Sequence, residues 1–254
     1  MEAPLFTIIT PSYNCADKLT QTIESVLSQD PSLVEYWIID GGSTDSTTFC
    51  LQSYGTRLRW VSEPDCGIYD AMNKGIERAS GRFLLFLGAG DRLFPDVLAE
   101  LARRLPPQDS SVIYGDVSWA GRIYDGPFTP RKLCVSNICH QAMLFGRGVF
   151  QRLGTYSLKY PTAADWEFNI RCFGDQAIAK VYTPLTISEF EPGGISSHGD
   201  QLFDQDRSNL IRRHLGLSIY VGWRWRHYKR RLREKLEPAL KTAEQYLTAI
   251  GSTR

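Results

Sequence analysis

The chain contains the stretch Ser62-Glu-Pro-Asp-Cys-Gly-Ile-Tyr-Asp-Ala-Met-Asn-Lys-Gly75 and, a few residues later, the stretch Phe83-Leu-Leu-Phe-Leu-Gly-Ala-Gly-Asp91. The first opens with the turn residues Pro64 and Gly67, and we expect Asp65 to cap a helix that follows. Apolar residues then recur at helical spacing, at Ile68, Met72, Ile76 and Ala79. The first stretch therefore predicts a turn that leads into an amphipathic helix.

The second stretch predicts a strand that is buried on both faces, because residues 83–87 are all apolar. Gly81 is expected to end the preceding helix, and Asp91 follows the carboxyl end of the strand. Polar side chains that can converge on another face of the helix lie three and four residues apart, at Asp70, Asn73 and Lys74. The helix face and the strand end therefore predict two walls of one pocket.

Strands and helices alternate through the N-terminal half of the chain. Further strands are expected at residues 5–10, 34–39 and 58–61, with helices at 17–28 and 45–54. This alternation predicts right-handed βαβ crossovers and an α/β, Rossmann-like fold with a mainly parallel sheet flanked by helices. Polar clusters follow four of the strands, at residues 11–14, 40–45, 63–67 and 88–91. They would share one edge of the sheet, where ligands of open α/β sheets bind.

The second half has a looser pattern. We expect helices at 94–105, 162–173 and 200–214, a strand at 111–116, a hairpin arm at 117–124 and a loop at 184–200. The second of these helices carries Asp165, and the pair His140-Gln141 precedes another strand. We divide the chain into one domain at 1–215, with halves at 1–105 and 106–215, and a basic helical tail at 216–254.

The composition sets broad limits on partners and compartment. A net charge of +1 over 254 residues gives no overall attraction to nucleic acid, and none is expected as a partner. The six cysteines include no Cys-x-x-Cys pair, so we expect reduced thiols in a chain large enough to fold without disulfides. We recognise no signal segment and no apolar run of about 20 residues. These features predict a cytoplasmic protein.

The tail differs in composition from the rest of the chain. Residues 222–235 mix Arg and Lys with Trp223, Trp225 and Tyr228, a pattern that suits an amphipathic helix on an anionic membrane surface. Two other interpretations stay open: a basic helix that packs its aromatic side chains on the domain, and a contact between two copies. If the tail binds lipid, the protein would be peripheral on the inner face of the cell membrane.

Side chains at the expected sheet edge suit a nucleotide diphosphate with a metal ion beside it. Asp91 can bind a hard divalent cation, which takes oxygen ligands from protein, phosphate and water. Asp40 could accept a hydrogen bond from a base ring, and Tyr13 could stack on that base. The pair Gly41-Gly42 permits close backbone approach.

Four motifs stand in a fixed order along the chain. They are Thr10-Pro-Ser-Tyr-Asn14, Asp40-Gly-Gly-Ser-Thr-Asp45, Glu63-Pro-Asp-Cys-Gly-Ile-Tyr-Asp-Ala-Met-Asn-Lys-Gly75 and Gly88-Ala-Gly-Asp91. Together they resemble the inverting family-2 glycosyltransferases with the GT-A fold, over residues 5 to about 200, and look closest to the branch for bacterial surface polysaccharides such as colanic acid and O-antigen. The resemblance implies a UDP-, GDP- or dTDP-linked sugar donor, a glycan or lipid-linked acceptor, and one divalent cation, Mn²⁺ or Mg²⁺.

The resemblance also implies roles for residues on the donor side. Pro11 and Tyr13 would line the nucleoside pocket, and Asp40 would bind the base. Asp65 and the helix behind it would flank the sugar nucleotide. The other donor-binding residues would be Asn14, Gly67, Asn73, Lys74 and Gly90. Residues 1–105 would thus form the nucleotide-sugar-binding half.

The metal and acceptor residues are implied in the same way. Asp91 matches the last acid of the family's Asp-x-Asp metal motif, and Ala89 replaces the first. His140 and Gln141 match a pair near the acceptor or the diphosphate. Asp165 matches the general base, which takes a proton from the acceptor hydroxyl as that oxygen attacks the anomeric carbon and inverts it. Residues 106–215 would form the acceptor-binding half.

Several alternatives stay open. Asp165 could simply cap its helix, and His140 could be a hydrogen-bonded core histidine. Cys134, Cys139 and His140 could bind zinc, although their spacing fits no common site. The competing functions are a nucleotidyltransferase and a catalytically silent sugar- or partner-binding module on the same fold, and the competing mechanism is a retaining transfer with two carboxylates.

Overall fold

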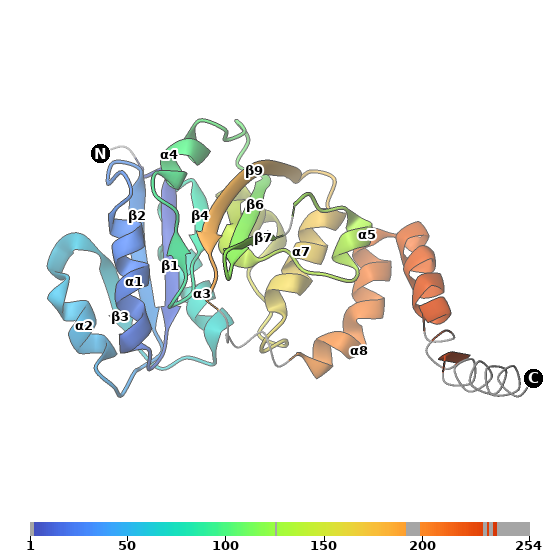
Figure 1. Cartoon of the computed structure of the whole chain (residues 1–254), viewed down its shortest axis with the longest axis horizontal. Coiled ribbons are helices and arrows are strands. Elements are labelled where there is room, and N and C mark those ends of the chain that lie inside the picture. Colours follow the sequence, from blue (N-terminus) through green and yellow to red (C-terminus); the bar gives the residue numbers. More distant parts are fainter. Residues whose placement is uncertain (1–2, 125, 192–198, 231–232, 234–235, 238–254) are drawn as a thin grey trace, which may run out of the picture.

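The N-terminal half forms the parallel part of one continuous sheet (Figure 1). The computed structural model describes residues 3–124, 126–191, 199–230, 233 and 236–237. Four strands pair in the order β3-β2-β1-β4, namely β1 (Phe6–Ser12), β2 (Val34–Asp40), β3 (Arg59–Ser62) and β4 (Phe83–Phe86). The pairings among them are parallel, as the alternation of strands and helices predicts.

The register of these strands brings their carboxyl ends to one edge. Ser12 lies opposite Asp40, and Asp40 lies opposite Ser62. The connecting helices are α1 (Ala16–Leu27), α2 (Thr47–Ser53) and α3 (Ile68–Arg78), with a 3-10 turn at Gly55–Arg57 before β3. The polar clusters after β1, β2, β3 and β4 therefore share one edge of the sheet, which confirms that prediction.

Helix α3 packs its apolar stripe on the sheet, but its ends differ from the prediction. Its buried residues are Tyr69, Ala71, Met72 and Gly75, and Ile68 and Ile76 pack on the same core. Gly67 is the N-cap with φ 114°, and Asp65 does not cap the helix because Asp65 Oδ1 accepts a hydrogen bond from the N–H of Gly67, at 2.8 Å. The helix ends at Arg78 because Ala79 is already extended, so Gly81 is not its end.

The second half of the sheet is mixed in direction. Its strands are β5 (Arg92–Leu93), β6 (Ser111–Trp119), β7 (Arg122–Tyr124), β8 (Met143–Gly146) and β9 (Ala179–Glu189). β8 lies antiparallel between β4 and β6, while β9 runs parallel to β6 and antiparallel to β5. β6 and β7 form the expected hairpin, whose tight turn forces an antiparallel pair. β9 includes residues 184–189, which the sequence predicts as loop, so that expectation is wrong for these six positions.

Helices of the second half cover the sheet and lead away from it to the C-terminal end (Figure 1). They are α4 (Val97–Ala102), α5 (Pro130–Leu133), α6 (Arg147–Leu153), α7 (Ala164–Gly174) and α8 (Gln201–Leu210), followed by a π-helical turn at Ile211–Leu215 and by helical residues 217–230. α7 and α8 confirm two of the predicted helices. α4 is shorter than predicted because Asp96, just before it, has a left-handed backbone with φ 56°.

Two apolar clusters cover the two faces of the sheet. One is rich in aromatic rings and packs beneath α3, α6 and α7. The other contains aliphatic side chains of α1 and α4. β4 contributes Leu84 and Phe86 to the first cluster and Phe83 and Leu85 to the second, because successive side chains of a strand point to opposite faces. This confirms that β4 is buried on both faces.

The tail begins as a helix that is packed on the domain through Trp223. This side chain is 7% exposed and lies in a small cluster with Cys134 and Ile211. Most of the helix predicted beyond residue 230 lies outside the described residues, and the division of the chain at 105 and 215 stays a prediction. In the described part of the chain, we find no helix that is long and apolar enough to cross a membrane. The six cysteines are free thiols, as predicted.

Candidate active site

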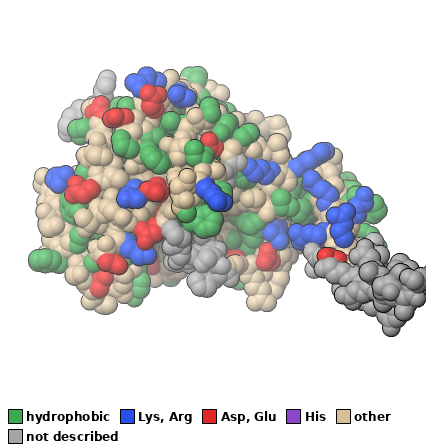
Figure 2. Space-filling model, viewed as in Figure 1, with side chains coloured by type: hydrophobic (Ala, Val, Ile, Leu, Met, Phe, Trp, Pro, Cys, Tyr) green, Lys and Arg blue, Asp and Glu red, His purple; other side chains and the backbone are tan. Residues whose placement is uncertain are grey.

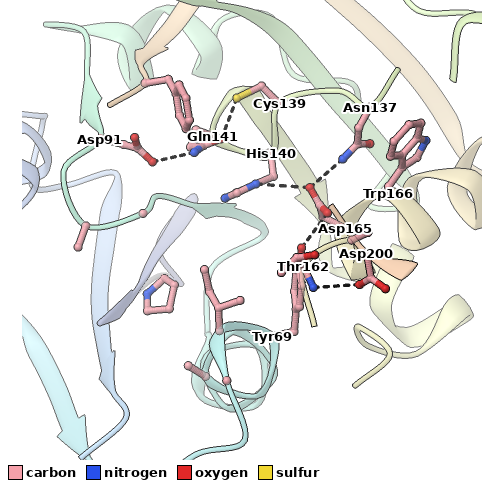
Figure 3. A pocket seen from close by; sticks show the side chains of 18 of the residues that line it. Tyr69, Asp91, Asn137, Cys139, His140, Gln141, Thr162, Asp165, Trp166 and Asp200 are labelled. Carbon is pink, nitrogen blue, oxygen red and sulfur yellow. Dashed lines mark hydrogen bonds and ion pairs between the residues drawn. The ribbon is translucent and has the colours of Figure 1, made fainter. Parts of the chain in front are cut away.

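A cavity of about 1160 Å³ opens at the carboxyl edge of the parallel strands. Its walls come from the loops after β1, β2, β3 and β4 and, opposite them, from residues 137–141, α7 and α8 (Figure 3). The volume exceeds the roughly 300–1,000 Å³ of sites that hold one small ligand. The cavity is therefore large enough to hold a sizeable small molecule.

The cavity is lined by some of the predicted donor-binding residues. It is also lined by all of the residues that were predicted to bind the metal, to contact the acceptor or diphosphate, or to act as the base. On the donor side, it is lined by Pro11, Tyr13, Asp65 and Gly67. The structure does not place on its wall the other predicted donor residues, Asn14, Asp40, Asn73, Lys74 and Gly90. Asp91, His140, Gln141 and Asp165 all line it. The fold thus brings the predicted metal ligand and the predicted base into one cavity, although 74 positions separate Asp91 from Asp165 in the sequence.

Asp40 holds the donor-side loops together instead of facing the cavity. Its carboxylate is fully buried and accepts five hydrogen bonds, from the hydroxyls of Ser12, Ser43 and Ser62 and from the backbone N–H groups of Gly42 and Ser43. A carboxylate offers about four lone-pair positions, so no acceptor capacity is left for a base. In this structure Asp40 therefore holds the loops around it, and its contact with the base stays a prediction.

Asn14 and Gly90 set the course of two loops. Asn14 has φ 46°, and its Oδ1 accepts a hydrogen bond from the N–H of Thr44 at 2.8 Å, which ties the loop after β1 to the loop after β2. Gly90 has φ 105°, a conformation that favours glycine, and its N–H donates to Thr22 Oγ1 at 2.8 Å. This turn places Asp91 against the cavity.

Asn73 and Lys74 do not line the cavity, and both hold segments of the chain beside it. Asn73 exchanges two hydrogen bonds of 2.9 Å with the backbone of Tyr156, because its side chain faces the second half of the molecule. Lys74 Nζ donates to the carbonyl oxygen of Pro64 at 2.8 Å and lies 3.7 Å from the Asp70 carboxylate. The expected convergence of Asp70 and Lys74 thus occurs, and it stabilises the turn before α3.

Asp91 is a buried carboxylate on the cavity wall, with 4% of its surface exposed. Its Oδ2 accepts a hydrogen bond from Gln141 Nε2 at 2.8 Å, and its Oδ1 accepts one from the N–H of Glu191 at 2.9 Å. Burial raises the pKa of Asp91 above its ordinary value, and these two hydrogen bonds oppose that rise without cancelling it. A Cβ at position 88 would lie 2.7 Å from Asp91 Oδ2, so Gly88 leaves the space that the carboxylate occupies.

The surroundings of Asp91 fit a divalent cation that takes most of its ligands from a substrate. Among the described residues, no group of three His, Cys, Asp or Glu side chains could hold a metal ion, which also leaves the zinc alternative without support. Each Asp91 oxygen accepts one hydrogen bond and keeps a further acceptor position. Diphosphate oxygens and water are ligands that Mg²⁺ and similar hard cations accept readily.

Asp165 lies in the first turn of α7 and faces the cavity (Figure 3). Its Oδ1 accepts a hydrogen bond from the Tyr69 hydroxyl and its Oδ2 accepts one from Asn137 Nδ2, both at 2.8 Å. Burial and, next, the charge of Asp165 raise the pKa of Tyr69, so this hydroxyl keeps its proton and stays a donor. The N-cap of α7 is Ala163, and both Asp165 oxygens bind side chains, so the alternative of a helix cap finds no support.

His140 lies beside Asp165 on the cavity wall (Figure 3). Its Nδ1 is 3.5 Å from Asp165 Oδ2, and 18% of its side chain is exposed. Its Nε2 is buried and has no hydrogen-bond partner within the described structure. Buried ring nitrogens are normally paired, so His140 does not behave as a satisfied core histidine and leaves one polar atom for a ligand.

Three residues of the site escaped the sequence analysis: Tyr69, Asn137 and Glu191. Tyr69 lies in the stretch 62–75, but the helical pattern of that stretch was recognised from its neighbours Ile68 and Met72. Asn137 is a single polar residue in an irregular segment, and no pattern marks it. Glu191 follows β9 at the same edge of the sheet. An acid directly after a strand could have indicated it, but this region was predicted to be a loop.

An apolar wall faces the donor side of the cavity. Trp119 and Tyr124, from the β6–β7 hairpin, are 41% and 37% exposed, and their ring centroids lie 5.4 Å apart. Trp166 also lines the cavity, and its ring packs on the buried ring of Phe203, with the two ring centroids 5.0 Å apart. Exposed aromatic faces at a cavity pack well against flat apolar surfaces of a ligand.

Solved glycosyltransferases share the GT-A fold of this chain. The structure superposes on S. aureus TarS in complex with UDP-GlcNAc with a TM-score of 0.63 and 16% identity, over 83% of this chain and 71% of TarS. It superposes equally well, with a TM-score of 0.63 and 18% identity, on the mannosyltransferase PcManGT from Pyrobaculum calidifontis in complex with GDP-Man and Mn²⁺, over 100% of this chain and 76% of PcManGT. At these identities the likeness shows the shared fold.

Sequence relatives give the family. The family model described as Glycosyl transferase family 2 matches residues 7–151, so the chain belongs to that family and is a glycosyltransferase. A protein of Mycobacterium tuberculosis named PGL/p-HBAD biosynthesis glycosyltransferase is 40% identical over 207 residues, which cover 78% of this chain and 81% of the relative. TuaG of Bacillus subtilis, named for teichuronic acid biosynthesis, is 41% identical over 99 residues, which cover 37% of this chain and 39% of TuaG.

The contrast between Asp40 and Asp65 gives a first prediction. Replacing Asp40 by Ala leaves buried donors without an acceptor, so we expect the free energy of unfolding to fall by about 3 kcal/mol. Asp65→Ala removes one hydrogen bond at the cavity wall and should cost less than about 1 kcal/mol. Urea unfolding of both variants measures the difference. If Asp40→Ala is as stable as the unmodified protein but no longer binds nucleotide, Asp40 instead contacts the ligand.

Proposed function

We propose that this protein transfers one sugar from a nucleotide-diphosphate donor to a hydroxyl of a glycan or lipid-linked acceptor, with inversion at the anomeric carbon, in the synthesis of a surface glycan. The observation that carries the proposal is the pair formed by Asp91 and Asp165, which line one cavity from opposite halves of the molecule (Figure 3). The names of the relatives, in PGL and in teichuronic acid biosynthesis, support a surface glycan as product.

The donor would lie along the edge of the parallel strands. Tyr13 is 61% exposed and lines the cavity beside Pro11, so its ring is free to stack on a base. The loop that Asp40 stabilises lies next to it and presents the backbone of Gly41 and Gly42 to the cavity. The UDP, UDP-GlcNAc and GDP-Man found in the structural neighbours support a nucleotide sugar as donor, and they leave the base open among uracil, guanine and thymine.

Asp165 would act as the general base. Tyr69 and Asn137 donate to its two oxygens, which fixes the carboxylate in one orientation and leaves each oxygen a second acceptor position. One of these positions would accept the proton of the acceptor hydroxyl while that oxygen attacks the anomeric carbon. An attack from the side opposite to the leaving diphosphate inverts this carbon.

Negative charge would develop on the leaving diphosphate during the transfer. Asp91 would hold a divalent cation, which when bound neutralises that charge as a Lewis acid. Gln141 keeps Asp91 in place, and the buried Nε2 of His140 could donate a hydrogen bond to a phosphate oxygen from the same wall. The Mn²⁺ in the PcManGT complex supports this assignment by analogy of fold.

The acceptor would enter from the second half of the molecule. The wall of Trp119, Tyr124 and Trp166 lies on that side and offers aromatic faces to a sugar ring or to an aglycone. A nucleotidyltransferase gains no support, since the chain belongs to a glycosyltransferase family. Transfer assays of variants at the two carboxylates distinguish a catalytically silent binding module from the proposed transferase.

The direct test of the proposed function is the variant Asp165→Asn. It keeps the size of the side chain and removes the base, so we expect transfer to fall by about 100-fold or more. Nucleotide affinity should stay within about threefold, because Asp165 lies on the acceptor side. Donor-dependent transfer and nucleotide binding by calorimetry measure the two effects.

Asp206→Asn is the matched control for this experiment. Asp206 also accepts a hydrogen bond of 2.8 Å from a tyrosine hydroxyl, that of Tyr160, but it does not line the cavity. Transfer by this variant should match that of the unmodified protein. Full activity of Asp165→Asn would remove Asp165 as base, and a lack of transfer from any nucleotide sugar by the unmodified protein would favour the silent module.

A thermal-shift experiment tests the proposed metal site. We expect UDP or GDP with Mn²⁺ or Mg²⁺ to raise the Tm by roughly 5–10 °C at a hundredfold excess over Kd. Asp91→Ala should lose the metal-dependent part of this shift, while Asp17→Ala, an exposed acid in the first turn of α1, should keep it.

The pH dependence of this shift follows from the raised pKa of Asp91. A carboxyl whose pKa is raised in the folded state stabilises the fold while it is protonated, and this contribution to the free energy of unfolding is lost as the pH rises through that pKa. A cation bound to the ionised carboxylate offsets the loss. The metal-dependent part should therefore grow with rising pH and shrink towards acid pH. An unchanged metal effect in Asp91→Ala would contradict the assignment.

A further inference from the structure

The helix at residues 217–230 exposes a continuous apolar stripe. Its members are Leu217, Val221, Trp225 and Tyr228, which are 66%, 56%, 57% and 58% exposed. They are spaced by four, four and three residues, so at 100° per residue they fall within an arc of about 80° on one face of the helix. Large apolar side chains are seldom gathered in this way on a surface that faces only water.

The opposite face of the same helix already holds it to the domain. Trp223 is 7% exposed and packs with Cys134 and Ile211, and Ile219 and Tyr220 add to this contact. The helix therefore has two apolar faces, one that is covered and one that is not. The exposed stripe plays no part in docking the helix, so its composition needs another explanation.

Positive charge surrounds the stripe. Residues 211–230 include six Arg and Lys residues and no Asp or Glu. Arg224 and Lys229 flank the stripe on its two sides, and Lys229 Nζ lies 5.0 Å from the centroid of the Trp225 ring. Figure 2 shows Lys and Arg side chains gathered over the C-terminal helix, beside apolar ones, at the end of the molecule away from the parallel strands.

We propose that this face of residues 217–230 binds an anionic lipid bilayer. Leu217, Val221, Trp225 and Tyr228 would enter the interfacial layer, where Trp and Tyr are favoured because their rings are apolar and their edges polar. The flanking Arg and Lys side chains would contact acidic headgroups, each contributing about fivefold to the binding constant. The helix would lie flat on the surface and would not cross it.

A second copy of the chain fits this face less well. Four side chains on one helix provide much less than the roughly 800 Å² per partner that a stable interface buries. A symmetric contact between two such faces would also bring Arg224 and Lys229 of one copy towards those of the other, with no acid among residues 211–230 to pair them. Anionic lipid matches both the apolar stripe and the charge.

The stripe lies at the acceptor end of the molecule. α8 carries Phe203 and Asp204 on the cavity wall, and the chain then runs through the turn Ile211–Leu215 directly into this helix. Binding to a bilayer would thus bring the acceptor side of the cavity towards the membrane. The inference goes beyond the proposed function, because binding to vesicles requires no transfer reaction.

Co-sedimentation of the full-length protein with vesicles tests the proposal. We expect binding to vesicles of phosphatidylcholine mixed with phosphatidylglycerol, at least tenfold weaker binding to phosphatidylcholine alone, and weaker binding at high salt. The double variant Trp225→Ala/Tyr228→Ala should bind the anionic vesicles at least tenfold less. Both side chains are exposed, so the fold should be kept, and circular dichroism and Tm check this.

Two further variants make the outcome decisive. Arg224→Glu/Lys229→Glu should lose at least tenfold in binding to the anionic vesicles and keep the Tm. Phe49→Ala, which removes a 75% exposed aromatic ring from α2, should bind like the unmodified protein. Undiminished binding by the Trp225/Tyr228 variant, or equal binding to both vesicle types, would overturn the proposal. A dimer in sedimentation velocity that the Trp225/Tyr228 variant dissociates, without vesicle binding, would also overturn it.

Discussion

The hydrogen bond from Gln141 to Asp91 joins the two halves of the molecule at the site. Asp91 follows β4, and Gln141 precedes β8, which pairs with β4, so the continuity of the sheet brings these residues together. Tyr69 makes a second link, from α3 in the first half to Asp165 in the second. Each carboxylate depends on a donor from the other half, because a buried donor or acceptor without its partner costs about 1–3 kcal/mol. Neither half alone would keep the site in this geometry.

Polar residues of the site divide into those that hold loops and those that face the cavity. Asp40 and Asn14 hold the loops after β1 and β2, and Lys74 fastens the turn before α3. Asp91 and Asp165 face the cavity, each with one acceptor position per oxygen left open. A flexible nucleotide sugar is positioned accurately only if the loops around it are held in place. The division between loop-holding and cavity-facing residues meets this requirement. Asp40 thus has a role in holding these loops that requires no contact with a ligand.

The alternating strands and helices of the N-terminal half could be predicted from the sequence, whereas features that depend on individual side-chain contacts could not. The apolar runs of β1 to β4 and the polar clusters behind them follow from strand–helix alternation, and the structure confirms their shared edge. Hydrogen-bond partners do not follow from spacing: Asn73 shares a helix turn with Asp70, yet it binds the backbone of Tyr156. β9 was not predicted, because residues 184–189 lack a regular apolar pattern and were expected to form a loop, and Glu191 was missed with it. The resemblance to known enzymes, and no local pattern, indicated Asp165.

In the proposed mechanism, Asp165 serves as a base opposite a leaving diphosphate, and no second carboxylate acts as nucleophile. The anomeric configuration of the first-formed product tests it most directly, by proton NMR of the transferred sugar before any spontaneous equilibration. We expect the configuration to be inverted relative to the nucleotide sugar, because a single displacement takes place at that carbon. Retention of the donor's configuration would require two displacements and would exclude this role for Asp165.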